Sequence, residues 1–182
     1  VLVLRPEAVE GGKYMRKAIL NSIRPKWCKL IASGEKTVEI RKTKPNAILP
    51  LKCYIYETLG DERAGNAEYN YIKKGYGRGK VIGEFVCHNI FPVWPGYIVS
   101  DGLTFAEQED YLGERGRGWG WTISNLVIYD TPKEVNEFWR LPCERISDCG
   151  NCRKFDRENM ACTRPPIITR PPQSWCYVEE NT

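Results

Sequence analysis

The sequence lacks the long apolar run that a membrane-spanning helix requires. No stretch approaches the ~18 consecutive apolar residues of such a helix. The N-terminus also lacks a charged start followed by a long apolar region and a small-residue cleavage site, which together mark a secretory signal. These absences argue against a helical membrane protein and predict a cytoplasmic one.

The sequence also lacks a strong net charge and has a single histidine, His88. The 27 Lys and Arg residues against 23 Asp and Glu give a formal net charge of +4, which is only mildly basic. A nucleic-acid partner would therefore have to be bound by a local basic patch rather than by the field of the whole chain. The lone histidine falls inside a predicted strand, and we assign it no catalytic role.

What the chain has is enough apolar sequence for one domain with an appended or inserted module. It contains 182 residues, of which 42% are hydrophobic. We expect residues 1–14 to be a tail or leader, with Met15 as a plausible natural start. Residues 15–182 should form the domain, and residues 141–165 an inserted cysteine-rich module.

We predict the functional centre at residues 34–41, which read Gly-Glu-Lys-Thr-Val-Glu-Ile-Arg. Apolar and polar residues alternate here as in a half-buried strand, so Val38 and Ile40 should face a core. The polar side chains would lie on the opposite face and at the mouth of the strand: Lys36, Thr37, Glu39 and Arg41. The alternative is an amphipathic edge strand whose charges are simply solvated.

A short helix is predicted immediately before this strand. Pro25 suits the first turn of a helix that runs through Ser33. Gly34 supplies the left-handed residue that ends the helix. Because an apolar strand over residues 18–23 comes first, the chain predicts strand, helix, glycine and charged strand in direct succession.

Most of the remaining predicted elements are strands, over residues 51–58, 81–91 and 174–178, with a pair of strands over residues 121–130. A capping box at Thr104 predicts a helix over residues 105–112. A second capping box at Thr131 predicts a short helix that reaches about Trp139. Strands dominate without sustained helix–strand alternation, which predicts a mainly β, α+β fold with a closed or nearly closed mixed barrel rather than a doubly wound sheet.

Residues 60–79 combine glycine with aromatic and basic side chains. Lys73 and Lys74 are suited to neutralising phosphates, and the interleaved tyrosines are suited to stacking on bases. The alternative is a mobile hairpin tip with solvated charges. Composition alone leaves both interpretations open.

Four of the eight cysteines cluster before the last predicted strand, with the spacing Cys-x5-Cys-x2-Cys-x9-Cys. They are Cys143, Cys149, Cys152 and Cys162. Four thiolates suit tetrahedral zinc and leave no open coordination position, so we predict a structural zinc in a small knuckle-like insertion. Two disulfides are disfavoured by a reducing compartment, and free thiols by the clustering. The others are predicted to be buried small apolar residues: Cys28, Cys53, Cys87 and Cys176.

Zinc content tests this prediction. We expect about one zinc ion per chain in protein purified without added metal, because the polar segment has no core of its own and structural zinc contributes about 10–16 kcal/mol of apparent binding energy. Elemental analysis measures the content. Less than about half an equivalent per chain would contradict a structural site.

Two segments resemble a known family. They read Ser22-Ile23-Arg24-Pro25-Lys26-Trp27 and Gly34-x-Lys36-x-x-Glu39-x-Arg41. Both are similar to the ASCH (activating signal cointegrator homology) domain, a branch of the PUA-like superfamily. The resemblance is strongest over residues 18–44 and extends more loosely to residue 178. Residues 118–130 and 170–179 also resemble prophage-encoded members.

The resemblance implies a PUA-like mixed β-barrel with short flanking helices and a cleft for RNA or a modified nucleotide. One bacterial branch of the family consists of amidohydrolases that deacylate acetylated cytidine with a Lys and a Thr of this motif and a downstream Glu. By resemblance, Lys36 matches the Lys, and Glu109 falls in a segment like the one that carries the Glu. Glu39 stands where that branch has its Thr.

The first functional hypothesis is a nucleic-acid-binding module. Lys36 and Arg41 would contact phosphate, and Glu39 would accept hydrogen bonds from a base edge. Trp119 or Trp121 would stack on a base. This hypothesis is favoured because it needs no shifted pKa.

The second hypothesis is a hydrolase that acts on nucleic acid or on an acylated nucleoside. Glu39 or Glu109 would activate water as a general base, and Lys36 would stabilise the developing oxyanion. A general base at neutral pH needs a carboxyl pKa raised toward 7, and nearby cations act in the opposite direction.

Overall fold

The structure, a computed structural model, describes residues 16–59, 78–97, 102–141 and 166–180, with short pieces of backbone between 155 and 162. The strands are β1 (Lys17–Ile23), β2 (Val38–Arg41), β3 (Leu51–Glu57), β4 (Val81–Cys87), β5 (Ile90–Val93), β6 (Gly118–Thr122), β7 (Ser124–Lys133), β8 (Phe155–Asp156), β9 (Ala161–Cys162) and β10 (Trp175–Glu179). The helices are α1 (Pro25–Ala32) and α2 (Phe105–Leu112), with single 3-10 turns η3 (Gly113–Arg115) and η4 (Val135–Glu137).

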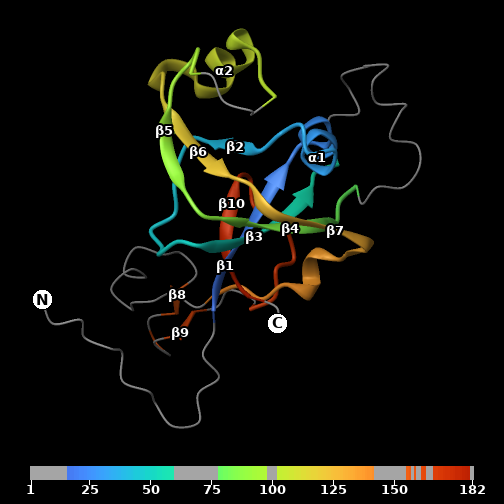
Figure 1. The fold of residues 1–182 in the computed structure, drawn as a ribbon. Helices are drawn as coiled ribbons and strands as arrows, with labels where there is room; N and C mark the ends of the chain where they lie inside the picture. Colours follow the sequence, from blue (N-terminus) through green and yellow to red (C-terminus); the bar gives the residue numbers. More distant parts are fainter. Residues whose placement is uncertain are drawn as a thin grey trace, which may run out of the picture.

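The strands form two main sheets (Figure 1). The five-stranded sheet has the order β10-β1-β3-β4-β7, with β1 and β3 parallel and the other neighbours antiparallel. The three-stranded antiparallel sheet has the order β2-β6-β5. The mainly β, α+β prediction is confirmed. Among the described strands, however, hydrogen bonding does not close a barrel, because β2 and β10 remain edge strands of separate sheets.

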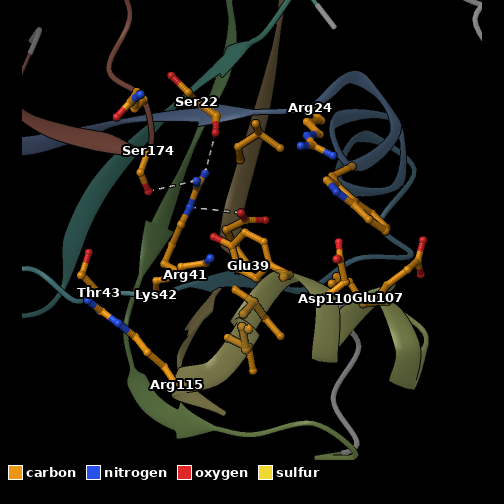
Figure 2. Close-up of a pocket in the computed structure, with 18 of the residues that line it drawn as sticks. Ser22, Arg24, Glu39, Arg41, Lys42, Thr43, Glu107, Asp110, Arg115 and Ser174 are labelled. Atoms are coloured by element: carbon orange, nitrogen blue, oxygen red, sulfur yellow. Dashed lines mark hydrogen bonds and ion pairs between the residues drawn. The ribbon is translucent and has the colours of Figure 1, made fainter. Parts of the chain in front are cut away.

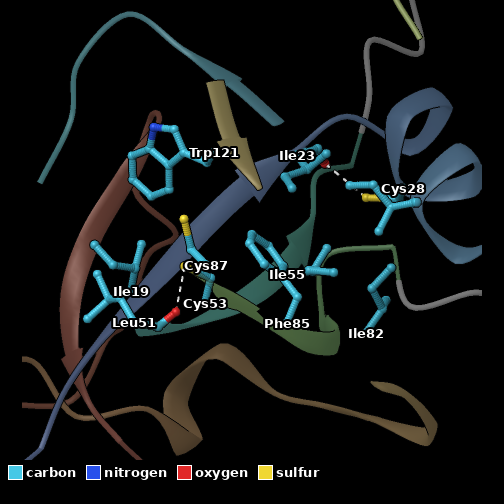
Figure 3. Close-up of a cluster of buried hydrophobic side chains, with 11 residues drawn as sticks. Ile19, Ile23, Cys28, Leu51, Cys53, Ile55, Ile82, Phe85, Cys87 and Trp121 are labelled. Carbon is cyan, nitrogen blue, oxygen red and sulfur yellow. Dashed lines mark hydrogen bonds between the residues drawn. The ribbon is translucent and has the colours of Figure 1, made fainter. Parts of the chain in front are cut away.

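The larger part of the hydrophobic core lies between these two sheets (Figure 3), and a further cluster of buried residues, which includes Leu20, Tyr54 and Phe138, lies on the other face of the five-stranded sheet. Ile19 of β1, Ile55 of β3 and Phe85 of β4 meet the fully buried indole of Trp121 from β6. Indole burial of this kind contributes a large share of core stability. The core therefore fixes β6 against the larger sheet, and β6 in turn positions β2.

The prediction of four buried cysteines is confirmed for three of them, and the fourth is half-buried. Cys28, Cys53 and Cys87 belong to the core cluster, and burial raises the pKa of all three thiols. Cys176 of β10 is half-buried. These four thiols act as small apolar side chains.

Strand β2 is covered on both faces. Its apolar face packs on α2, where Ile40 joins Leu112 and Val93 in a smaller cluster. The predicted alternation is therefore correct, with Glu39 and Arg41 on the other face, but these charged residues are only 6% and 5% exposed. The alternative of a solvated edge strand is wrong, because the larger sheet and its loops cover the charged face.

The segment that leads into β2 folds as predicted. Pro25 occupies the first turn of α1, and Gly34 adopts a φ of 80° just beyond its end. The Lys36 backbone N–H then donates to the Leu30 carbonyl over 2.9 Å, which turns the chain back along the helix. Lys36 is consequently 1% exposed rather than at an open strand mouth, whereas Thr37 is exposed.

One predicted capping box is confirmed and the other is wrong. Thr104 and Glu107 form both reciprocal hydrogen bonds at the start of α2. Thr131 does not begin a helix, because β7 continues through Lys133, which pairs with Val81 of β4. Strand pairing overrides the local helix signal here, and a capping box forms three residues later around the single turn η4.

Several predictions fall outside the described residues. These are the tail over residues 1–14, Met15, the basic residues Lys73 and Lys74, and the zinc ligands Cys143, Cys149 and Cys152. Of Cys162, only the backbone is described, as part of the β8–β9 pair. No helix in the described ranges is long and apolar enough to cross a membrane. His88 is exposed in the turn between β4 and β5.

Candidate functional site

A pocket of about 1150 Å³ lies where the charged face of β2 meets the end of β1 (Figure 2). Its walls come from residues 22–27, 36–43, 103–115 and 173–174, together with Thr58. Two helices, α1 and α2, therefore flank the pocket, and the segment before β10 completes it. Most of the charged motif that the sequence singled out lies inside.

Gly118 of β6 allows α2 to approach β2 closely enough to form one wall. A Cβ atom at this position would lie 2.6 Å from Leu112 Cδ2 and 2.8 Å from the Arg41 carbonyl oxygen. Any larger residue would push α2 away from the strand. Across the mouth, the Lys26 ammonium of α1 pairs with Glu107 Oε1 of α2 over 2.7 Å.

A chain of three buried charges crosses the pocket floor. Lys36 Nζ lies 3.4 Å from Glu39 Oε2, and Arg41 Nε lies 3.2 Å from Glu39 Oε1. Lys36 Nζ also donates a 2.8 Å hydrogen bond to the Val38 carbonyl. One carboxylate thus sits between two cations, which is the arrangement that makes buried charge tolerable.

The guanidinium of Arg41 links three parts of the chain (Figure 2). Nη2 donates to the Ser22 carbonyl over 2.9 Å, and Nη1 donates to Ser174 Oγ over 3.4 Å. Ser22 belongs to β1, and Ser174 comes just before β10. Arg41 is thereby fixed in place with its stem along the pocket.

Two polar atoms of this charge chain are buried without a hydrogen-bond partner, Glu39 Oε2 and Arg41 Nε. Their separations from the neighbouring charges are ion-pair distances, but neither contact meets the geometry of a hydrogen bond. Such atoms are uncommon in native proteins and call for an explanation. Both atoms belong to residues that line the pocket, and both are shielded from solvent in the structure.

Aromatic and charged side chains make up the rest of the walls. Trp27 lies 5.5 Å from Lys36 Nζ, and Tyr111 lies 5.3 Å from Lys42 Nζ, measured to the ring centroids. Burial raises the pKa of the Tyr111 phenol, and the Arg41 guanidinium partly offsets the shift. Exposed cations surround the opening at Arg24, Lys42 and Arg115.

Carboxylates also reach the pocket, and one of them is engaged by other groups. The hydrogen bond from Lys26 is the main reason that the pKa of Glu107 is lowered to about 2, with a further contribution from the Thr104 backbone N–H. Asp110 lies beside it on α2. In the part of the chain that the structure describes, no group of three His, Cys, Asp or Glu side chains could hold a metal ion.

Comparison with known proteins identifies the fold. No family model matches the sequence, and no curated protein matches it. Among solved structures, a Tyr-to-Phe variant of the ASCH protein from Zymomonas mobilis aligns with a TM-score of 0.54 and 18% identity, over 89% of this chain and 90% of that chain. A Ser-to-Ala variant of the same protein gives a TM-score of 0.53 and 18% identity, over 88% and 87%.

The chain has the ASCH fold. The resemblance inferred from residues 22–41 is thus confirmed at the level of the fold. An identity of 18% carries no activity from one protein to the other. The relation to prophage-encoded members stays a prediction.

Within this ASCH fold the structure brings together only some of the predicted site residues. Lys36, Glu39 and Arg41 lie together on the pocket floor. Glu109 is exposed and does not line the pocket, because the pocket face of α2 carries Glu107 and Asp110. A helix turns by 100° per residue, so a side chain between two that face the pocket points elsewhere.

The predicted stacking residues do not line the pocket either. Trp121 is fully buried in the core and has no face available to a base. Trp119 is half-buried outside the pocket. The aromatic rings that do line it are those of Trp27 and Tyr111, and the sequence patterns predicted a binding role for neither. For Tyr111, the available signal was its spacing of four residues from Glu107 on a predicted helix.

Proposed function

We propose that this pocket binds a nucleotide of RNA or of another nucleic acid. The observation that carries the proposal is the pair of buried atoms without hydrogen-bond partners, Glu39 Oε2 and Arg41 Nε. A base edge presents donors and acceptors side by side, and it would satisfy both atoms at once. A ligand with only one kind of group would leave one of them unsatisfied.

The other walls suit the remaining parts of a nucleotide. Exposed Arg24, Lys42 and Arg115 at the opening are placed to contact phosphate. Trp27 and Tyr111 supply aromatic surface for a base. Lys36 and Arg41 neutralise Glu39, so a carboxylate can serve as an acceptor in a buried site at a moderate cost.

Size and fold both support this ligand class. A volume of about 1150 Å³ is slightly above the ~300–1,000 Å³ of small-molecule sites, which favours a nucleotide with part of its neighbour over a free base. ASCH folds are generally associated with RNA binding or hydrolysis. The same proposal covers a modified base, which the volume of the pocket also allows.

Hydrolysis receives less support. Its predicted general base Glu109 is outside the pocket, and Glu39 is already engaged by two cations, Lys36 and Arg41. The hydrolase alternative therefore rests on Lys36 alone among its predicted groups. The binding experiment also tests this alternative, because the same protein is assayed for turnover.

We predict that Arg41→Met lowers affinity for single-stranded RNA at least about tenfold, because a charged hydrogen-bond donor to the ligand is worth about 1.5–3 kcal/mol. Lys42→Ala should lower the slope of log affinity against log salt by about one, since one phosphate contact is lost. Fluorescence anisotropy with a random-sequence RNA at several salt concentrations measures both. Lys133→Ala is the matched control, because Lys133 lies on β7 outside the pocket.

Unchanged affinity and unchanged salt dependence in both variants would show that the pocket is not the binding surface. Thermal unfolding of each variant separates lost binding from lost folding. The same preparations should neither shorten RNA nor release acid from acylated cytidine. Turnover that Lys36→Ala abolishes would replace the binding proposal with the hydrolase.

A further inference from the structure

We propose that a second nucleotide of the bound strand stacks on Trp119, outside the pocket, and displaces Lys44 from that ring. This inference rests on the proposed function and narrows its ligand to a single-stranded polynucleotide rather than a free nucleotide. It places a second subsite at Trp119 of β6, beside the loop that follows β2.

Trp119 lies next to the pocket although it does not line it. In the antiparallel pair of β2 and β6, Trp119 is directly opposite Arg41. Directly opposite residues share one face of a sheet, with Cβ atoms about 4.5–5.5 Å apart. The indole of Trp119 therefore begins one strand spacing from the arginine on the pocket floor.

The chain between them carries positive charge away from the pocket. Lys42 and Thr43 line the pocket, and Lys44 follows as an exposed residue. Lys44 Nζ lies 4.3 Å from the centroid of the Trp119 ring. A strand that leaves the pocket along this loop would pass two ammonium groups, and each of them could contact a phosphate.

Trp119 has the exposure that a stacking platform needs. It is half-buried and packs against the core cluster, so its ring is held in position while part of it stays accessible beside Lys44. Trp121, which lies two residues further along β6 on the same face, is fully buried. Only Trp119 of this pair can receive a base.

Exchange of Lys44 for a base is favourable on general grounds. An exposed cation–aromatic contact is weaker than the stacking of a base on an aromatic side chain. The displaced ammonium also gains a partner, because the phosphate that joins the two nucleotides would lie between Arg41 and Trp119. Lys44 thus covers the ring in the free protein and neutralises the backbone in the complex.

The test compares ligands of different length. Affinities are measured for the four ribonucleoside monophosphates and for random-sequence oligoribonucleotides of two to six nucleotides. We expect the protein to bind the oligonucleotides more tightly than the monophosphates. Trp119→Leu should lose about tenfold in oligonucleotide affinity, since one stacked base is lost, and should keep its monophosphate affinity. Trp119→Phe should retain most of the oligonucleotide affinity.

Two lysine variants complete the design. Lys44→Ala should lower the salt slope for oligonucleotides by about one and leave that for monophosphates unchanged. Lys133→Ala is the control, because Lys133 also lies over an aromatic ring, 4.7 Å from the centroid of Tyr129, but on β7. Lys133→Ala should change neither the affinity nor the salt dependence for either ligand class.

The outcomes separate this inference from the proposed function. If the protein binds monophosphates but gains nothing with length, or if Trp119→Leu binds oligonucleotides like the parent protein, the second subsite is overturned and the pocket stands. If Trp119→Leu loses the same affinity for both ligand classes, Trp119 supports the pocket itself, and the second subsite is again overturned. If the parent protein binds neither class, both proposals fail.

Discussion

Glu39→Ala is expected to lower the free energy of unfolding by about 3–5 kcal/mol, which is the usual cost of removing one partner from a buried ion pair. Lys36 is 1% exposed and Arg41 5% exposed, so solvent cannot replace the lost carboxylate for either cation. Both cations would retain other contacts, to the Val38 carbonyl and to Ser22 and Ser174. Chemical denaturation followed by circular dichroism measures the change.

Two further variants make this result specific. Glu39→Gln keeps the volume and removes only the charge, so it isolates the electrostatic part of the loss. Glu109→Ala removes an exposed glutamate of α2 and should stay within about 0.5 kcal/mol of the parent protein. A loss below about 1 kcal/mol in Glu39→Ala would mean that the charge chain contributes little to the fold.

Glu57→Gln is expected to change how stability depends on pH. Glu57 ends β3 at 2% exposure, and its Oε2 has no hydrogen-bond partner. Burial raises the pKa of this carboxyl to about 7, although the nearby Arg78 guanidinium acts in the opposite direction. The folded state therefore holds a proton that the unfolded chain releases near pH 4.5.

The sign of the effect follows from this difference in proton binding. The contribution of Glu57 to the free energy of unfolding is fully present below its unfolded pKa of 4.5, and it is lost as pH rises through about 7. A shift from 4.5 to about 7 corresponds to a change on the order of 3 kcal/mol across this window. Glu57→Gln removes the ionisation, so the variant should match the parent protein at acidic pH and be more stable at pH 8.

Unfolding free energies at several pH values between acidic pH and pH 8 measure this difference. Glu109→Gln, an exposed glutamate on α2, should follow the parent profile throughout. If Glu57→Gln also runs parallel to the parent protein, the carboxyl of Glu57 ionises in the folded state without penalty and the explanation by burial is wrong.

The local patterns in the sequence predicted the elements that short-range chemistry determines. The alternation over residues 38–41 correctly assigned the two faces of β2, because the period of a strand is a property of neighbouring residues. The Thr104 capping box correctly placed the start of α2 for the same reason. Pro25 and Gly34 correctly bounded α1.

Long-range packing decided the rest. The burial of Glu39 and Arg41 depends on β1 and on the segment before β10, which no local pattern describes. Trp121 was predicted to stack on a ligand, but the sheet opposite turns it into a core residue. Thr131 carried a helix signal that pairing with β4 overrode. Each difference arises where distant parts of the chain meet.

The contact between Arg41 and Ser174 determines how late in the synthesis of the chain the pocket can be completed. These residues are 133 positions apart, and Ser174 forms part of the pocket wall. A ribosome would have released β1, α1 and β2 long before the residue that completes their pocket. A chain that stops before Ser174 therefore lacks one wall of the pocket and one of the hydrogen-bond partners that hold Arg41 in place.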